Sequence, residues 1–539
     1  MQRHSSLTCD VLVIGGGATG AGVLYDLSLR GVKTILAEQN DIATGTSGRY
    51  HGLLHSGGRY VVRDPESARE CIEENAIIRK IMPHVIEDTG GWFVATESDD
   101  PDYIPRWLEG CQKAGIPTEP ISLTEALKEE PAVTRRFQAA YRVPDAACDS
   151  FELVHTLTEA AATLGGKTLN YHQVCSIEKS GGQVTSAILE NRRTGERIHI
   201  ACRAIVNAAG PWAGQIANMV GANIHMTYDR GIMVAMNTRW TNTILNRLMM
   251  PGDGDILVPV GTVCVIGTTS VIVERPDDYT IPAHEVSEML DAGEKLIPEF
   301  RKARALRAWA GVRPLYDPPE HKHANGESSE GDGRFITRSF RALDHADIGA
   351  AGMLSIVGGK LTTYRQMAEK ISDKVCAYLG VQAACRTAET ALPKPSWFGG
   401  HGRKLHTMTS RLSQLEHAES QRGLICECEI VTRAQLETAI EASGEGVSLD
   451  DLRRDLRLGM GPCQAGFCGY RAAGILAETL KLPADHSVAA LEKFVEERFR
   501  GNRPLLWGHQ LRQALLDETI YRRALGLPVR QAANETAAD

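Results

Sequence analysis

The sequence predicts an α/β fold that begins with a Rossmann-like dinucleotide-binding unit and has a small metal-binding module towards its end. The first prediction rests on the stretch CDVLVIGGGATGAG, where an apolar segment meets a helical pattern through a run of glycines. The second rests on four cysteines arranged as two close pairs. The chain has 539 residues, of which 43% are hydrophobic and 23% charged, as expected for several globular domains.

The N-terminal segment predicts a buried strand over residues 11–14, a glycine turn and an amphipathic helix. Gly15, Gly17 and Gly20 give the pattern G-x-G-x-x-G, which lets a pyrophosphate sit on the helix N-terminus. Glu38 closes the next apolar run, where a carboxylate accepts hydrogen bonds from ribose hydroxyls. Together these residues predict a dinucleotide site, but the pattern does not separate FAD from NAD.

Glycine-limited turns recur further along the chain. An apolar run ends at Asn207 before an Ala-Ala-Gly turn, and a predicted strand over residues 353–359 ends in two glycines. The second turn leads into a helix, so its backbone N–H groups form another cradle for a polar group. Hydroxyl groups in the loop ATGTSG are further candidate donors. The residues expected around the cofactor in these places are Thr46, Ser47, Ala208, Gly210, Gly359, Lys360, Leu361 and Thr362.

The two cysteine pairs predict a metal site. Their spacing is C-x-C followed, further along, by C-x4-C, and four thiolates suit either Zn²⁺ or an iron–sulfur cluster. The glycines around the second pair let backbone N–H groups approach the sulfurs, which tunes a cluster and is not needed for a structural zinc. We therefore favour an electron-transfer centre over four ordinary buried cysteines. The expected ligands are Cys426, Cys428, Cys463 and Cys468.

Charge and composition restrict the class of protein. The net charge of −8 and the lack of a basic stripe argue against a nucleic-acid partner. Thirteen cysteines, an odd number and mostly scattered, fit reduced cytosolic thiols. No signal stretch precedes the first strand, and the longest apolar candidate, residues 256–273, resembles two strands around a turn rather than a membrane span. Membrane contact is therefore expected only through a surface or a partner.

The motifs GGGATGAG, HGLLHSGGRY, NAAGPW, VIGTTS, GVRPL and VGGKLTTYR, in this order, resemble those of the FAD-dependent glycerol-3-phosphate dehydrogenase family. The cysteine segment resembles the [2Fe-2S] module related to bacterioferritin-associated ferredoxin, and the combination is the layout of the anaerobic branch of that family. The resemblance implies a FAD-binding domain of the D-amino-acid-oxidase type with a mixed β-sheet substrate domain. The implied divisions are an FAD-dependent oxidoreductase at 8–385 with insertions near 96–150 and 215–340, a linker at 386–421, a ferredoxin-like domain at 422–475 and a helical region at 476–539.

The resemblance also implies an activity. In that family sn-glycerol 3-phosphate is oxidised to dihydroxyacetone phosphate with FAD as acceptor, and electrons pass through a [2Fe-2S] centre to partners. The partners are a second flavin subunit and an iron–sulfur membrane-anchoring subunit. Quinone is the final electron acceptor. We accordingly expect a cytoplasmic protein held at the inner face of the cell membrane by a partner. The C-terminal region around Arg500, Arg503 and Trp507 is a candidate docking surface.

Oxidation of a secondary alcohol needs a base, and two histidines of HGLLHSGGRY are candidates. The resemblance favours His55 over His51. A branch of the family has a second histidine after Lys-Gly-Ser, but the matching stretch here is Arg230-Gly231-Ile232-Met233, which contains none. This departure increases the expected role of His55.

A phosphate group calls for arginine, whose planar fork binds oxyanions through two hydrogen bonds. The resemblance assigns this role to Arg59, Arg313 and Arg338, with Tyr60 and Lys360 beside them. Arg313 stands in an apolar frame where an unpaired charge is costly, which favours a role in substrate binding and catalysis. Two alternatives stay open: the flavin component of an amine or opine dehydrogenase, and a flavoprotein whose cysteines hold a structural zinc for docking.

Overall fold

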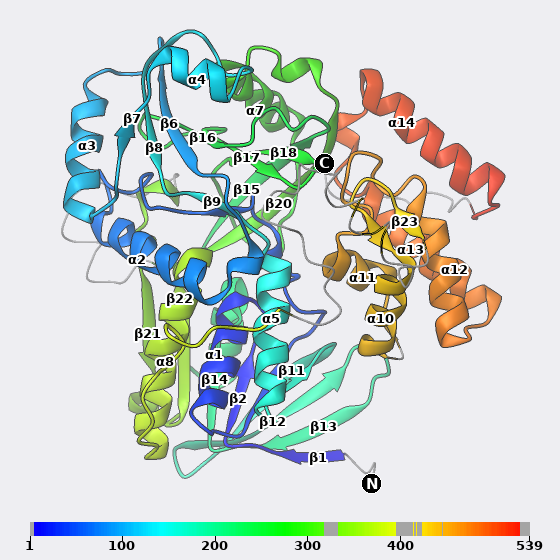
Figure 1. The fold of residues 1–539 in the computed structure, drawn as a ribbon. Helices are drawn as coiled ribbons and strands as arrows, with labels where there is room; N and C mark the ends of the chain where they lie inside the picture. Colours follow the sequence, from blue (N-terminus) through cyan, green and yellow to red (C-terminus); the bar gives the residue numbers. More distant parts are fainter. Residues whose placement is uncertain are drawn as a thin grey trace.

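The computed structural model describes residues 5–316, 333–394 and 423–528, except residue 445, together with residues 413, 415 and 417. It consists of a large α/β body and a smaller helical module packed against its side (Figure 1). Most of the expected linker at 386–421 lies outside the described residues. So do residues 529–539 of the expected C-terminal helical region.

A six-stranded sheet forms the centre of the first domain. Its order is β10 (Lys167–Leu169), β3 (Thr34–Ala37), β2 (Val11–Ile14), β14 (Ala204–Asn207), β22 (Met353–Gly358) and β21 (Phe340–Asp344). The first five strands are parallel, and β21 is antiparallel to β22. Because parallel strands end at one edge, the three predicted glycine turns after β2, β14 and β22 meet there.

Both faces of this sheet are covered, as its continuous apolar strands require. Val11 and Val13 belong to the core shared with helices α1 (Ala18–Leu29), α5 (Ser150–Thr163) and α8 (Tyr364–Leu379). Leu12 and Ile14 belong to the opposite core, which is shared with α6 (Ala213–Asn218) and a four-stranded sheet. That sheet has the order β1 (Ser5–Thr8), β13 (Arg197–Ala201), β12 (Gln183–Asn191), β11 (His172–Ser180). The alternation follows the two-residue period of a strand.

A nine-stranded, mostly antiparallel sheet forms the second domain. Its order is β19 (Val271–Val273), β15 (Thr227–Met236), β18 (Val263–Gly267), β17 (Ile256–Val260), β16 (Ile244–Arg247), β6 (Gly91–Thr96), β8 (Phe137–Val143) and β7 (Glu119–Pro120), with β20 (Ala305–Leu315) paired to β15. Helices α3 (Tyr103–Ala114), α4 (Leu123–Glu129) and α7 (Ala283–Leu296) accompany it. Helix α2 (Pro65–Ile81) and a small sheet of β4 (Leu53–Leu54), β9 (Ala146–Cys148) and β5 (Ile86–Glu87) lie near the junction of the two domains (Figure 1).

The C-terminal module has its own apolar core. It contains the hairpin β23 (Leu424–Cys426) and β24 (Val431–Thr432) and helices α10 (Arg433–Ser443), α11 (Leu449–Leu456), α12 (Cys468–Leu480), α13 (Ala484–Phe499) and α14 (Gly508–Glu518). Thr432 and Ser448 start α10 and α11 as N-caps, each with a reciprocal capping box. Helix α11 packs on α5 of the first domain. Within the described residues, no helix is both long and apolar enough to cross a bilayer.

Candidate active site and metal centre

The first glycine turn is too tight for side chains. Gly15 has φ +112°, and a Cβ added there would lie 2.5 Å from the carbonyl oxygen of Ala208. A Cβ on Gly20 would lie 1.9 Å from the Gly15 carbonyl oxygen. The turn therefore brings β2, β14 and the N-terminus of α1 into close contact, and its residues 15–19 line the cleft. This is the arrangement that a dinucleotide pyrophosphate needs.

Glu38 lies at the end of β3, beside this turn. Its Oε2 accepts a 2.8 Å hydrogen bond from the Gly16 amide, and its Oε1 accepts one of 2.8 Å from the Asn40 amide. Burial raises the pKa of this carboxyl group, and the two amide hydrogen bonds oppose the shift. The side chain is therefore fixed where a ribose would bind.

The hydroxyl groups of the ATGTSG loop have partners in the protein. Ser47 Oγ accepts a hydrogen bond of 2.9 Å from the Ala18 amide at the start of α1, and a Cβ on Gly17 would lie 3.0 Å from Ser47 Oγ. Thr46 Oγ1 donates a 2.6 Å hydrogen bond to the carbonyl of Val312, next to Arg313. The loop thus joins the cofactor cradle to strand β20 of the second domain.

The third turn has two consecutive left-handed residues, Gly358 at φ +78° and Gly359 at φ +80°. A Cβ on Gly359 would lie 2.4 Å from the sulfur of Met367, so glycine is required there. Leu361–Thr363 form a short 3-10 turn that leads into α8. Residues 358–362 line one continuous cleft of about 980 Å³, together with Ala208 and Gly210 after β14.

The structure distinguishes the two candidate bases. His51 Nδ1 accepts a 3.2 Å hydrogen bond from the Leu53 amide, so its lone pair is occupied. The His55 ring nitrogens make no hydrogen bond to the described residues, whereas its backbone amide donates one of 3.2 Å to Thr362 Oγ1 and its carbonyl accepts one of 3.1 Å from Asn75. The His55 ring lies 5.4 Å from the Tyr60 ring and 5.8 Å from the His51 ring.

Burial holds both imidazoles neutral. Burial and then the neighbouring cations Arg59 and Arg313 lower the pKa of His51 to about 3. The pKa of His55 is also well below its ordinary value of 6.5, first because of burial and then because of His51 and nearby cations. A neutral imidazole with an unoccupied nitrogen can accept a proton, which makes His55 the candidate base.

Two of the predicted arginines share one buried carboxylate. Asp229 Oδ2 lies 2.8 Å from Arg313 Nη1 and 3.5 Å from Arg338 Nη2. Asp229 and Arg313 are opposite each other in the register of β15 and β20. Arg338 Nη1 is buried without a hydrogen-bond partner. Burial, and then Arg313, lower the pKa of Arg338, so this group favours an added anion.

The other expected cations are paired as well. Arg59 contacts Asp255 and donates a 3.2 Å hydrogen bond to the carbonyl of Gly252. Lys360 Nζ lies 3.0 Å from Glu70 Oε2 and 3.2 Å from the Arg338 carbonyl. Tyr60 places its ring 5.8 Å from Lys360 Nζ. All five expected substrate residues therefore gather around one part of the cleft.

The carboxylates Asp229, Asp255 and Glu70 were not anticipated from the sequence. An acidic residue inside the apolar run of residues 228–236 was a signal for Asp229, since such a residue is rarely buried without a partner. Which cation it would pair with could not be inferred.

The four cysteines come together in the C-terminal module. The Cys426 and Cys428 sulfurs lie 3.9 Å apart, and those of Cys428 and Cys463 3.5 Å apart. Cys468 completes the group as a neighbour of Cys426. Two thiolates on one tetrahedral metal with bonds of about 2.3 Å are about 3.8 Å apart, so these separations suit metal ligation. The donor set fits a [2Fe-2S] cluster.

The glycines around the second cysteine pair have two different uses. The amide of Gly459 contacts the Cys426 sulfur, and a Cβ on Gly461 would lie 2.7 Å from the Cys428 sulfur. These two serve the approach to sulfur that the sequence suggested. Gly466 and Gly469 instead admit the chain's C-terminal region, since a Cβ there would meet Asp517 at 2.5 Å and Tyr521 at 2.4 Å.

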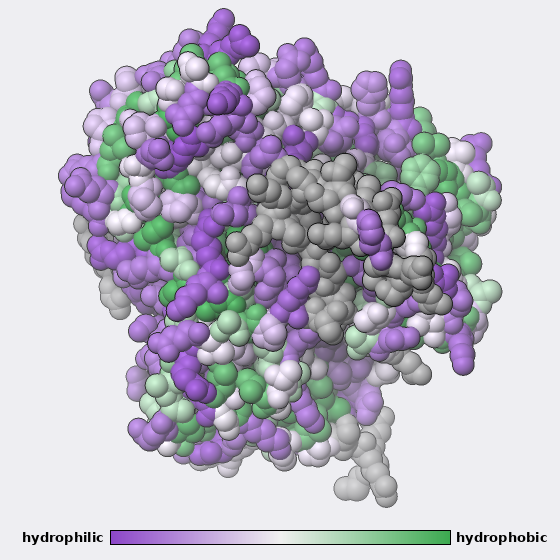
Figure 2. All heavy atoms as spheres, viewed as in Figure 1, coloured by the Kyte–Doolittle hydropathy of each residue, from purple (hydrophilic) through white to green (hydrophobic). Residues whose placement is uncertain are grey.

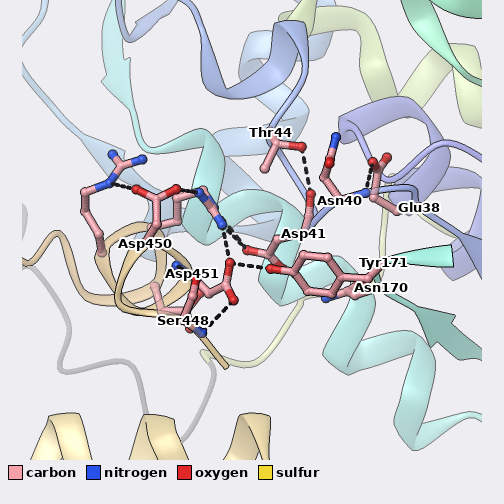
Figure 3. A network of polar contacts seen from close by, with 12 residues as sticks. Glu38, Asn40, Asp41, Thr44, Asn170, Tyr171, Ser448, Asp450 and Asp451 are labelled. Atoms are coloured by element: carbon pink, nitrogen blue, oxygen red, sulfur yellow. Dashed lines mark hydrogen bonds and ion pairs between the residues drawn. The ribbon is translucent and has the colours of Figure 1, made fainter. Parts of the chain in front are cut away.

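A buried ionic network joins the C-terminal module to the first domain. Arg454 of α11 lies 2.9 Å from Asp41 and 2.5 Å from Asp451, and it also contacts Asp450. Figure 3 shows Asp41 and Asp451 facing each other, with Tyr171 donating a 2.5 Å hydrogen bond to Asp451. Asp41 follows Glu38 closely in the chain, so the network reaches the loop that carries the carboxylate expected to bind a ribose.

Comparison with known proteins identifies both domains. Residues 10–365 match the family model "FAD dependent oxidoreductase", and residues 424–478 match "BFD-like [2Fe-2S] binding domain". The A1 component of the anaerobic glycerol-3-phosphate dehydrogenase of Haloferax volcanii is 40% identical over 98% of this chain and 92% of that protein. The A component of the Escherichia coli K12 enzyme of the same name is 39% identical over 98% and 99%.

The chain belongs to the family of A components of anaerobic glycerol-3-phosphate dehydrogenases. It is a flavoenzyme, and its cofactors are FAD and a [2Fe-2S] cluster, which decides against zinc. A glycerol-3-phosphate dehydrogenase structure from Bacillus halodurans, complexed with FAD, covers 93% of this chain and 96% of its own at a TM-score of 0.63 and 21% identity. That likeness confirms the predicted D-amino-acid-oxidase type of fold.

Proposed function

We propose that this enzyme oxidises sn-glycerol 3-phosphate to dihydroxyacetone phosphate. The observation that carries the proposal is the half-buried pair Arg313 and Arg338, which share a single buried carboxylate, Asp229. The unpartnered Nη1 of Arg338 needs an anionic acceptor, and a substrate phosphate supplies one. The names of the relatives at 39–40% identity support the same substrate. An amine substrate without an acidic group would offer no acceptor to the Nη1 of Arg338.

The chain's own residues would then divide the work. Arg59, Arg313 and Arg338 would hold the phosphate, and Tyr60 and Lys360 would close the side of the cleft next to His55. A neutral His55 nitrogen would take the proton from the substrate's secondary hydroxyl. Bound FAD would supply the two-electron acceptor. FAD would be held by the glycine turn after β2 and the N-terminus of α1, together with Glu38, Ser47 and residues 359–362.

The electrons must then leave one at a time, since a [2Fe-2S] cluster accepts single electrons. We infer that they pass to a second flavin subunit, then to an iron–sulfur subunit, then to quinone, which places this chain at the inner face of the cell membrane. The naming of the relatives as one component of a larger enzyme supports a multi-subunit assembly.

The test is anaerobic addition of sn-glycerol 3-phosphate to the purified holoprotein, followed by visible and EPR spectroscopy. We expect the flavin absorbance to bleach and a reduced [2Fe-2S] signal to appear. Glycerol, which lacks the phosphate, serves as the control substrate and should leave both spectra unchanged at the same concentration. An unchanged spectrum with sn-glycerol 3-phosphate, from protein that holds FAD, would refute the substrate assignment.

A further inference from the structure

Helix α14 packs with its polar side inwards. Gln510 and Asp517 are 4% and 6% exposed, whereas Leu511, Leu515 and Leu516 are 41%, 54% and 47% exposed. A surface helix of a globular protein ordinarily shows the opposite arrangement, with its apolar stripe facing the core. Leu506, Trp507 and Leu525, on either side of the helix, are exposed too. Figure 2 shows apolar side chains at the edge of the molecule where Figure 1 places α14.

The buried polar side of α14 is fitted to the cluster loop. Arg304 of the flavin body donates a 2.8 Å hydrogen bond to Gln510 Oε1 and one of 2.5 Å to the carbonyl of Pro462, which precedes Cys463. Asp517 packs on Gly466, and a Cβ at that glycine would lie 2.5 Å from its Oδ1. The inward orientation is thus specified by these polar contacts. The leucines of α14 are left outside as a consequence.

The exposed side of α14 is therefore separated from the cluster loop by about one helix diameter, roughly 10–12 Å. Phe467, next to the ligand Cys468, is 44% exposed. Cys428 and Cys463 are only partly buried, whereas Cys426 and Cys468 are buried. Electrons on the cluster are thus close to the apolar surface formed by α14 and its flanking residues, which we call the α14 surface (residues 506–525).

Cations border the α14 surface. A hollow of about 470 Å³ opens beside the helix, and its lining includes Lys302, Arg304, His509, Arg512 and Leu516 but no carboxylate. Arg512 forms no ion pair with any described residue, and Arg523 is exposed one turn beyond the helix. This local positive charge contrasts with the net charge of −8 for the whole chain. A hollow with a basic lining can accommodate an acidic side chain inserted by a partner protein. A flat bilayer surface has no side chain to insert.

We infer that the α14 surface is the docking site for the redox protein that takes electrons from the [2Fe-2S] cluster, and that this partner presents an apolar patch edged with carboxylates. The inference rests on the proposed function for the origin of the electrons. Each substrate molecule delivers two electrons, which leave the cluster singly and reduce a one-electron acceptor in the partner. An apolar centre with a charged rim is the usual composition of such an interface.

The test compares two double variants of the holoprotein. Leu511→Glu/Leu515→Glu places two charges on the surface, while Leu164→Glu/Ile348→Glu is the control, because those residues are 47% and 48% exposed far from α14 in sequence. Each is assayed with a small redox dye, which needs no docking, and with quinone in the complex formed with co-expressed partner subunits. For the Leu511/Leu515 variant we expect dye reduction within about twofold of wild type and quinone reduction lowered roughly tenfold or more. The control should change neither.

Complex formation is followed separately by co-elution in gel filtration, which needs no turnover. Failure of sn-glycerol 3-phosphate to reduce the dye would refute the proposed substrate, whereas co-elution still reports on docking. Retention of the complex and of quinone reduction by the Leu511/Leu515 variant would overturn the inference. So would α14-dependent self-association of the wild-type chain, or α14-dependent binding to phosphatidylglycerol vesicles without partners. If the partner is acidic, Arg512→Glu should reduce co-elution relative to wild type, and this reduction should be larger at low salt than at high salt.

Discussion

Replacing Arg454 by methionine should loosen the iron–sulfur module from the flavin domain. Arg454 is 6% exposed and is the cation shared by Asp41 of the flavin domain and Asp450 and Asp451 of α11. Methionine preserves much of the volume but leaves the carboxylates without this positive charge. Removing one partner of a buried ion pair costs about 3–5 kcal/mol, which corresponds to roughly a hundredfold or greater loss in a docking equilibrium.

The defect should depend on pH. Burial raises the pKa of Asp41 to about 6 from an ordinary 3.8, and Arg454 is the main group that opposes this shift. Without Arg454 the pKa rises further, so the folded state binds more protons than the unfolded state around neutral pH. Stability then falls as pH rises through that interval. The difference between wild type and Arg454→Met should therefore grow between about pH 5 and pH 8.

Stopped-flow absorbance can separate the two redox steps. We expect Arg454→Met to reduce its flavin with substrate at the wild-type rate and its cluster more slowly, and thermal unfolding of the module to begin at a lower temperature. Arg453→Met is the matched control, because Arg453 contacts Asp450 of its own helix at 2.7 Å. If Arg454→Met transfers electrons and unfolds as wild type does at every pH, the reasoning from the buried network is refuted.

Three further substitutions test the site. His55→Asn should lower kcat in the dye assay by about 10²–10⁴-fold with FAD content unchanged; a loss of only about twofold would exclude it as the base. Asp229→Asn should raise KM for sn-glycerol 3-phosphate by about tenfold, more than it lowers kcat, because Arg313 and Arg338 lose their shared anchor; an unchanged KM would contradict that role. Gly461→Ala should reduce the iron content and visible cluster absorbance while FAD binding persists, since its Cβ would lie 2.7 Å from the Cys428 sulfur; full iron content would show that the loop can move aside.

The cofactor elements could be predicted because their signals are local. The strand over residues 11–14, the glycines after it and Glu38 lie within one short stretch, and only glycine fits the contact between residues 15 and 20. The cysteine spacing likewise indicated one ligand cluster, and the family comparison then selected the iron–sulfur centre. Local motifs did not indicate which groups would neutralise the arginines.

Short-range patterns of residue type were enough to predict a dinucleotide site, a four-cysteine metal site and an α/β fold. The resemblance of the motifs to a known family was needed to select FAD, the [2Fe-2S] cluster and the expected basic residues of the substrate site. The pairings between charged groups depended on tertiary structure. Asp229 meets Arg313 through the register of β15 and β20, and Arg454 meets Asp41 across two domains. Packing also distinguished His55 from His51, because a backbone amide engages one ring nitrogen of His51. The two ion pairs join residues that are far apart in the chain, so they follow from how the sheets and helices pack. The contact of His51 with the Leu53 amide is local and is set by the path of the backbone in the folded protein.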